Sequence, residues 1–504
     1  MQKKFLTNLG LILFLNLLIK PIYVFGIDKA VQRQVGTGSY GSYFAIFNFC
    51  FLLTIILDFG ITNFNNKNIA QNNHLLTKHF SSLFTLKVLL AVVYIITVVV
   101  IGLVIGYDTR LMKLLLIQGF NMFLLFFINY LRSNLAGLHL FKTDGFISVL
   151  DRSLMIIICS WMLHSGIFYT ENGIMYFVYA QTFCYSVAAL TAFLIILKKT
   201  HTFKISWNWP FSLMILKKSL PFAILTLLMS FYNRIDSVMI ERILPDGDVQ
   251  SGIYAQGFRI LDATNMIAFL VAGVLLPVFS RMLKYKESVE SLVKLISTLL
   301  LTPAIVIGIG SFFYNTELIK MLYYPTQTGA LNIPGHIAVV QESAEVYAMH
   351  LKESAAIFGL LMLSFIAIAT TYIFGTLLTA NGNMRQLNYM AAFGMVLNVV
   401  FNYFLIKQFE AYGSSMSSLF TQFFTAIIQV AIAQRIFKFK VNWRLINTFI
   451  MYIFGVIAIN YGTHEMLPYP WMVRFAIMLV GCGLWAFITG IISIKGMFRL
   501  LKYG

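Results

Sequence analysis

Charged residues are scarce in this sequence of 504 residues: only 11% are charged, whereas 59% are hydrophobic. A soluble globular protein carries about 25% charged residues, so the composition excludes that class. Apolar segments of about 20 to 28 residues recur along the chain, and each is long enough to cross a ~30 Å hydrocarbon core as a helix. Alternating strands of about 10 residues, which a membrane β-barrel requires, are not seen. The sequence therefore predicts an all-α polytopic membrane protein.

Cysteine is also scarce, and the signatures of several enzyme classes are missing. No H-E-x-x-H motif is present and the eight histidines are scattered, so we expect no metal site. No G-x-x-x-x-G-K-[ST] motif is present, so we do not expect ATP to drive the protein. We expect no cofactor and no enzymatic activity. The cysteines all fall within apolar runs and form no C-x-x-C pair, which favours buried packing: Cys50, Cys159, Cys184 and Cys482.

Two patterns near the N-terminus are misleading. Residues 36–41 read GTGSYG and match G-x-G-x-x-G, but they lie between two predicted membrane helices rather than after a strand. The first residues, with two lysines before an apolar run, resemble a signal peptide. No small-residue cleavage site follows, and Lys20-Pro21-Ile22 continues the run. We therefore expect no nucleotide site and a retained first helix.

The apolar segments predict about fourteen transmembrane helices, and an even number places both termini on one side. We expect an N-terminal six-helix lobe at 1–210, a C-terminal six-helix lobe at 211–440, and two extra helices at 441–504. The predicted spans are 7–27, 40–64, 80–106, 111–134, 145–166, 173–197, 213–240, 251–278, 292–314, 355–380, 387–406, 412–436, 446–462 and 471–494.

Positive charge is distributed unequally between the two sides of these spans. Most of the 37 Lys and Arg residues fall in loops on the side of the termini. Cytoplasmic loops are enriched in Lys and Arg, so both termini are expected in the cytoplasm. The net charge of +18 is therefore mainly a topology signal. A nucleic-acid partner is not expected.

An internal repeat relates the two predicted lobes. Residues 34–47 read QVGTGSYGSYFAIF and residues 248–258 read DVQSGIYAQGF. Gly41 aligns with Gly252 and Tyr43 with Tyr254, an offset of 211 residues. Each sequence opens a predicted span, the second and the eighth, which is the pattern of repeated transporter halves.

Charged residues inside the apolar spans are the candidate functional groups. Each costs roughly 2.5–3.5 kcal/mol at the centre of a bilayer, so they are expected to line an aqueous path or to form pairs. We predict that Lys20, Arg234 and Arg259 bind an anion such as pyrophosphate in a cavity between the lobes. Asp236 and Asp262 are the predicted groups for ion or proton coupling, since a desolvated carboxylate titrates at a higher pH. The alternative is a set of structural salt bridges, with Arg259–Asp262 as an intrahelical pair.

Two other pairs of charges are expected to be structural. Asp58 and Lys87 lie in the inner third of adjacent predicted helices, which favours a salt bridge. Asp151 and Arg152 are expected near the membrane edge.

Seven short motifs follow one another along the chain: 40–43 (YGSY), 57–61 (LDFGI), 68–70 (NIA), 234–236 (RID), 251–255 (SGIYA), 378–382 (LTANG) and 411–415 (AYGSS). In order and spacing they resemble the motifs of Wzx-type polysaccharide flippases, which belong to the multidrug/oligosaccharidyl-lipid/polysaccharide exporter superfamily. One feature departs from the pattern, since the external segment 314–354 is longer than the usual connection.

The resemblance implies two six-helix lobes that work by alternating access in a bacterial inner membrane. It implies that undecaprenyl-pyrophosphate-linked oligosaccharide moves from the cytoplasmic to the periplasmic leaflet, for O-antigen, lipopolysaccharide, capsule or exopolysaccharide assembly. Implied partners are the lipid-linked oligosaccharide, membrane lipids, a polysaccharide polymerase and glycosyltransferases, with proton or sodium coupling. Lys20, Arg234 and Arg259 are the residues implied to hold the pyrophosphate.

Two alternatives remain open. An ion-coupled multidrug antiporter of the same superfamily would favour acidic residues in its cavity, which the predicted cations disfavour. A membrane polysaccharide polymerase usually places arginines in a large external loop. Segment 314–354 contains Lys320 and Lys352 but no arginine.

Overall fold

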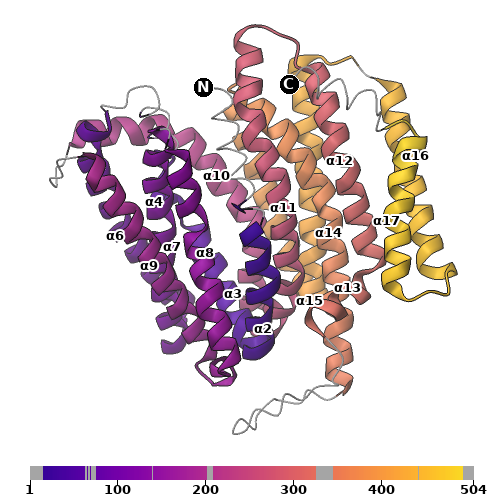
Figure 1. The fold of residues 1–504 in the computed structure, drawn as a ribbon, viewed down its shortest axis with the longest axis horizontal. Helices are drawn as coiled ribbons and strands as arrows, with labels where there is room; N and C mark the ends of the chain where they lie inside the picture. The colour runs from indigo at the N-terminus through magenta and orange to yellow at the C-terminus, as the bar shows by residue number, and fades with distance from the viewer. Residues whose placement is uncertain are drawn as a thin grey trace. The chain divides into compact units, whose positions relative to one another are not determined.

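The computed structural model describes residues 15–16, 18–62, 65, 69, 75–138, 140–200, 208–324, 344–440 and 442–491. No β-strand occurs in these ranges, where nearly every residue is helical (Figure 1). The chain divides into two compact units. The first comprises Met1–Gly252 and Gly329–Gln341, and the second comprises Ile253–Thr328 and Glu342–Gly504. The lobe boundaries predicted from the repeat stay a prediction.

The first unit consists of long helices that run alongside one another, coloured indigo to magenta in Figure 1. A π-helix (η1) and a 3-10 helix (η2) interrupt the α-helices of this unit. Its elements are η1 (Tyr23–Asp28), α2 (Lys29–Val35), α3 (Thr37–Leu52), α4 (Ile55–Asp58), α6 (Leu75–Ile105), α7 (Thr109–Gly137), α8 (Phe141–His164), η2 (Ile167–Tyr169), α9 (Gly173–Thr200) and α10 (Trp209–Ile243).

The second unit contains most of α11, whose first residues belong to the first unit. Its elements are α11 (Gly247–Lys284), α12 (Glu290–Phe313), α13 (Asn315–Tyr323), α14 (Ala344–Ala380), α15 (Met384–Phe437), α16 (Trp443–Tyr461), the π-helix η3 (Gly462–Met466) and α17 (Trp471–Ile488).

Eleven helices in the described ranges are long and apolar enough to cross a membrane. One of them, α15, covers two predicted spans, because Glu410 adopts a non-helical conformation with φ of 52°. The predicted span 40–64 is divided into α3 and α4, and part of the predicted span 7–27 lies outside the described residues. The prediction of an all-α polytopic membrane protein is confirmed, with eleven candidate spans in the described ranges against about fourteen predicted.

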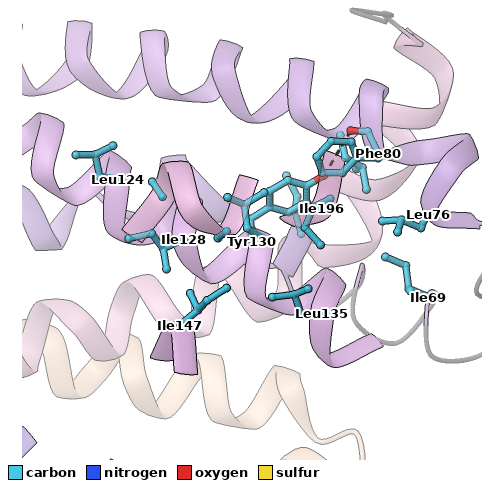
Figure 2. Packing of buried hydrophobic residues seen from close by; sticks show 14 of the residues in the cluster. Ile69, Leu76, Phe80, Leu124, Ile128, Tyr130, Leu135, Ile147 and Ile196 are labelled. Atoms are coloured by element: carbon cyan, nitrogen blue, oxygen red, sulfur yellow. Dashed lines mark hydrogen bonds between the residues drawn. The ribbon is translucent and has the colours of Figure 1, made fainter. Parts of the chain in front are cut away.

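Apolar and aromatic side chains hold the first unit together where α6, α7, α8 and α9 pack (Figure 2). Phe80 and Tyr130 stack almost in parallel, with ring centres 6.2 Å apart and an interplanar angle of 9°. The buried Ala188, Ala189 and Ala192 lie on α9 within the same cluster. Small residues of this kind let membrane helices approach closely, because lipid provides no hydrophobic drive for helix association.

Buried polar side chains join the two halves of α15 in the second unit. The Ser414 hydroxyl donates to Asn402 Oδ1 at 2.6 Å, and the Ser417 hydroxyl donates to the Asn398 carbonyl at 3.1 Å. The Asn402 amide also donates to the Asn398 carbonyl at 2.9 Å. The two serine bonds link the halves on either side of Glu410, where the helical conformation breaks, so one continuous helical segment provides two spans.

The C-terminal helices α16 and α17 pack on α12. Their contact is mainly apolar and includes Ile305 and Ile309 from α12, Val456 from α16, and Met478 and Ala486 from α17. The two extra helices are therefore attached to the second unit mainly through α12.

Candidate functional site

Arg152 lies close to the midpoint of the candidate span Lys142–His164 in α8. The expectation that Arg152 lies near the membrane edge stays a prediction, although its place in the middle of this helix disfavours it. That expectation assumed a span at 145–166, but α8 begins at Phe141, which moves Arg152 toward the middle of the helix. An arginine within a membrane-spanning helix is costly to the protein and marks a candidate functional group.

Two tyrosine rings lie against the Arg152 guanidinium. Its central carbon is 4.5 Å from the ring centre of Tyr23 and 5.6 Å from that of Tyr185, and the side chain is 23% exposed. Its Nε lies 3.6 Å from the carboxylate of the neighbouring Asp151. Cation–π contacts of a desolvated guanidinium are worth about 2 kcal/mol or more, so these rings offset part of the cost of burying the charge.

Lys20 belongs to the same electrostatic neighbourhood. Arg152, Arg132 and Asp151 all lie close enough to act on its ammonium group. Arg132 is paired with Asp144, with Nε 2.7 Å from the carboxylate. These groups comprise three cations and two carboxylates, so their charges do not balance. Such an excess of positive charge in a low-dielectric region favours binding of an anion.

The π-helix η1 carries two of the buried groups in the first unit. Pro21, which lacks a backbone donor, precedes η1, and short π-helical turns occur frequently at functional sites. Tyr23 reaches Arg152 from η1, and Asp28 at its other end accepts a hydrogen bond of 2.7 Å from the Tyr40 hydroxyl. Asp28 was missed at the sequence level, because the predicted first span ended at residue 27, whereas the helical segment continues to Val35.

Aromatic side chains follow one face of α3. Ring centres are 5.5 Å apart for Tyr40–Tyr43, 6.1 Å for Tyr43–Phe47 and 6.4 Å for Phe47–Phe51. Their spacing of three and four residues places them on the same side of the helix. The Arg234 guanidinium carbon lies 4.5 Å from the ring centre of Phe51, at the far end of this row. The row thus runs from Tyr40, which donates a hydrogen bond to Asp28, to Phe51, which contacts Arg234.

Arg234 and Asp236 lie on α10, within the first unit. Arg234 Nη1 donates to Asn48 Oδ1 at 3.1 Å, and Asn48 Nδ2 donates to the Ser237 hydroxyl at 2.8 Å. Asp236 is buried. Sequence reasoning did not identify Asn48, although a polar residue within the run 44–53 was a visible signal. The binding role of Arg234 and the coupling role of Asp236 stay predictions.

Arg259 and Asp262 lie on α11 in the second unit, and both are half-buried. Their separation of three residues places them on one face of the helix. The cavity predicted to unite them with Lys20, Arg234 and Asp236 stays a prediction.

Asp58 and Lys87 form an ion pair in the first unit. Lys87 is only 3% exposed, and its ammonium also donates to the Leu57 carbonyl at 3.0 Å. The helix breaks just after Asp58, where Phe59 and Gly60 have φ of 43° and 77°. A broken helix leaves carbonyls without intrahelical partners, so Lys87 satisfies groups that lipid cannot. That this pair is purely structural stays a prediction.

Among the described residues, no group of three or more His, Cys, Asp or Glu side chains has an arrangement suited to a metal ion. All four cysteines lie in the described part of the chain and are buried.

The chain matches one protein family in sequence and known membrane transporters in fold. Residues 6–283 match the family model described as "Polysaccharide biosynthesis protein". No curated protein sequence matches the chain. The solved structure of a lipid II flippase MurJ, in an inward closed conformation, aligns with a TM-score of 0.66 and 12% identity, over 95% of this chain and 98% of that one.

Two other solved structures share the fold. An inward-facing multidrug resistance MATE family transporter aligns with a TM-score of 0.62 and 13% identity, over 82% of this chain and 94% of its own. A MOP superfamily transporter from Pyrococcus furiosus aligns with a TM-score of 0.59 and 14% identity, over 86% and 96% of the two chains. At these identities the likeness shows the fold, which is that of MOP superfamily transporters and flippases.

Proposed function

The chain belongs to the polysaccharide biosynthesis protein family, and from this premise we propose that it is a flippase for lipid-linked oligosaccharide. It moves undecaprenyl-pyrophosphate-linked oligosaccharide from the cytoplasmic to the periplasmic leaflet of a bacterial inner membrane. Both of its termini lie in the cytoplasm, and it makes and breaks no covalent bond. The product supplies O-antigen, lipopolysaccharide, capsule or exopolysaccharide assembly, together with glycosyltransferases and a polymerase.

The observation that carries this proposal is the placement of Arg152 at mid-span, with Lys20 and Arg132 in the same electrostatic neighbourhood. A pyrophosphate diester carries two negative charges, and a guanidinium binds phosphate oxygens through two parallel N–H donors. The charges around Lys20 leave an excess of one cation, which attracts an anionic headgroup. Before the headgroup binds, the Tyr23 and Tyr185 rings hold the Arg152 guanidinium in place.

Transport follows from moving the headgroup while leaving the lipid tail in the bilayer. The headgroup enters from the cytoplasm, its phosphates meet the cationic groups, and the lobes exchange access to the other side. Arg234 and Arg259 contribute further positive charge along the path. A proton or sodium gradient resets the cycle through Asp236 or Asp262, since an ion that binds one access state more tightly than the other shifts the equilibrium between them.

The shared fold with a lipid II flippase supports a lipid-linked saccharide as the cargo. The shared fold with a multidrug resistance transporter favours a second candidate, an ion-coupled multidrug antiporter. The buried Asp28, hydrogen-bonded to Tyr40, also fits a proton-coupled antiporter. The excess of cations around Lys20 disfavours cationic drugs as cargo, because it repels them.

Purified protein in proteoliposomes tests the proposal. The probe is a fluorescent undecaprenyl-pyrophosphate-linked oligosaccharide, and the readout is protection of its sugar from an added glycosidase. We expect Arg152→Ala and Lys20→Ala to reduce flipping at least tenfold, whereas Lys113→Ala, at an exposed position of α7, leaves it unchanged. Wild-type rates equal to those of empty liposomes, together with uptake of a cationic drug, would establish the antiporter instead.

A further inference from the structure

Asn48, Phe51, Arg234 and Ser237 form a four-membered contact between α3 and α10, which pack along each other in the first unit. Asn48 and Phe51 are three residues apart on α3, and Arg234 and Ser237 are three residues apart on α10. Each pair therefore shares one helix face. The Arg234 guanidinium meets Asn48 through a hydrogen bond of 3.1 Å and Phe51 through a cation–π contact of 4.5 Å.

The chemistry of the three polar groups fixes the orientation of the Asn48 amide. An arginine side chain only donates hydrogen bonds, so Asn48 must turn its carbonyl oxygen toward Arg234. The Asn48 NH₂ group then faces Ser237, whose hydroxyl accepts its hydrogen bond at 2.8 Å. Asn48 is 1% exposed, so water does not compete for these bonds. Ser237 thus orients Asn48, and Asn48 in turn orients Arg234.

We infer that Asn48 is a positioning residue for Arg234, holding its guanidinium in the orientation that meets the pyrophosphate of the cargo. This inference rests on the proposed function. Phe51 packs against the guanidinium, and Asn48 accepts a directional hydrogen bond from it. A neutral amide is suited to this task, because it directs the guanidinium without neutralising the charge that attracts the phosphate.

Because the Asn48 amide is neutral, its replacement with a carboxylate can distinguish positioning of Arg234 from simple packing of the two helices. Replacing Asn48 with aspartate keeps the size of the side chain and strengthens its bond to Arg234. If Asn48 only joins two helices, Asn48→Asp is therefore tolerated or stabilising. If Asn48 presents Arg234 to an anion, the new carboxylate competes with the phosphate and binding is lost while the fold remains.

The experiment measures binding of undecaprenyl pyrophosphate, which carries no sugar, to purified full-length protein in detergent. The variants are Asn48→Asp, Asn48→Leu, Ser237→Ala and Arg234→Ala, and thermal unfolding of each is measured in parallel. Asn121→Leu is the matched control, because Asn121 is also buried in the first unit and donates to the Val178 carbonyl at 3.4 Å. That variant removes a buried asparagine between two other helices, α7 and α9.

We expect Asn48→Asp to weaken binding at least tenfold without lowering the unfolding temperature. Ser237→Ala frees the amide to rotate, and we expect it to weaken binding about threefold, a loss that Asn121→Leu does not share. Asn48→Leu is expected to weaken binding as well as to lower the unfolding temperature. Because Ser237→Ala acts on the same amide from α10, it keeps the test decisive if both Asn48 variants misfold.

Three results would overturn the inference, and they are distinguishable. If wild type and Arg234→Ala both fail to bind the lipid, the proposed function and the inference fall together. If wild type binds and Arg234→Ala binds equally well, Arg234 is not a binding residue, and Asn48 has nothing to position. If Arg234→Ala weakens binding but Asn48→Asp and Ser237→Ala match wild type, the inference alone is wrong.

Discussion

Gly41 and Gly252 lie against each other's backbones at the N-terminal ends of α3 and α11. A Cβ atom on Gly41 would lie 1.8 Å from the Asp248 carbonyl oxygen, and one on Gly252 would lie 2.1 Å from the Thr37 carbonyl oxygen. The Ser251 hydroxyl also donates to the Gly41 carbonyl at 3.3 Å. The contact is reciprocal, because Asp248 follows Thr37 by the same 211 residues that separate Gly252 from Gly41. This reciprocity is what a two-fold relation between repeated sequences produces.

Substituting either glycine is expected to disrupt this crossing of α3 and α11. Gly252→Ala places a methyl group on the Thr37 backbone, which cannot move as a flexible side chain can, and overpacking of this kind costs about 1–3 kcal/mol or more. We expect a lower thermal unfolding temperature for Gly41→Ala and Gly252→Ala, measured in detergent. Gly273→Ala is the control, since Gly273 lies in the same α11 with no atom near its Cβ position. Equal unfolding temperatures for all three variants would contradict the close packing of Gly41 and Gly252 against the facing backbone.

The Tyr23 ring, rather than its hydroxyl, is expected to support Arg152. Tyr23→Phe keeps the aromatic face and should retain flipping and stability close to wild type. Tyr23→Leu removes the cation–π contact and leaves the guanidinium poorly compensated, so we expect a loss of about 1–2 kcal/mol in stability and a clear loss of flipping. Unfolding temperature and proteoliposome flipping are measured on the same preparations. A Leu variant that behaves like the Phe variant would show that the ring contact is dispensable.

Breaking the Asp58–Lys87 pair is expected to be strongly destabilising. Lys87→Met leaves a carboxylate without its cation and the Leu57 carbonyl without its donor, and loss of one partner of a buried pair costs about 3–5 kcal/mol. Combining Lys87→Met with Asp58→Asn removes both charges and should recover part of that loss.

A double-mutant cycle on denaturation of the purified protein measures the coupling of this pair. If the pair is only structural, the double variant should flip the lipid at a rate near wild type. Normal stability combined with abolished flipping in the double variant would instead place the pair in the transport cycle.

A polar cluster is expected to attach the C-terminal helices beyond their apolar contact with α12. Glu317 on α13 lies 3.3 Å from His464 Nε2 and 3.6 Å from Arg474, and Tyr314 donates to the Thr463 hydroxyl at 2.9 Å. Glu317→Ala removes the anion that links α13 to both η3 and α17.

We expect the Glu317→Ala variant to be cleaved faster by a protease in the loop before α16, whereas Glu345→Ala, at an exposed position, is cleaved at the wild-type rate. Cleavage of Glu317→Ala at the wild-type rate would mean that the apolar contact with α12 alone holds α16 and α17 in place.

The helices were predictable from the sequence because their cause is local. Each apolar run has the length of a membrane crossing, and the ion pair between Asp58 and Lys87 follows from two charges at similar depth on adjacent helices. Gly41 and Gly252 were identifiable as equivalents from a short shared motif. Their mutual contact was not, because alignment shows equivalence but not proximity.

The arrangement around Arg152 could not be predicted for a different reason. An error of a few residues in a helix boundary moves a charge from near the end of a helix to its middle, as it did for Arg152. The contact of Arg152 with Tyr23 and Tyr185 joins elements far apart in the sequence, so the spacing of residues along the chain does not predict it. Asn48 was missed likewise, because a single amide in an apolar run shows its role only when Arg234 and Ser237 face it.

The most direct test of the account is the leaflet in which the lipid-linked oligosaccharide resides in cells depleted of this protein. Spheroplasts are prepared before and after depletion, and the oligosaccharide is probed with a lectin that does not cross the membrane. The account predicts that depletion traps the oligosaccharide on the cytoplasmic leaflet, and that wild type but not Arg152→Ala restores lectin binding. Unchanged lectin binding after depletion, in cells without a second flippase, would contradict it.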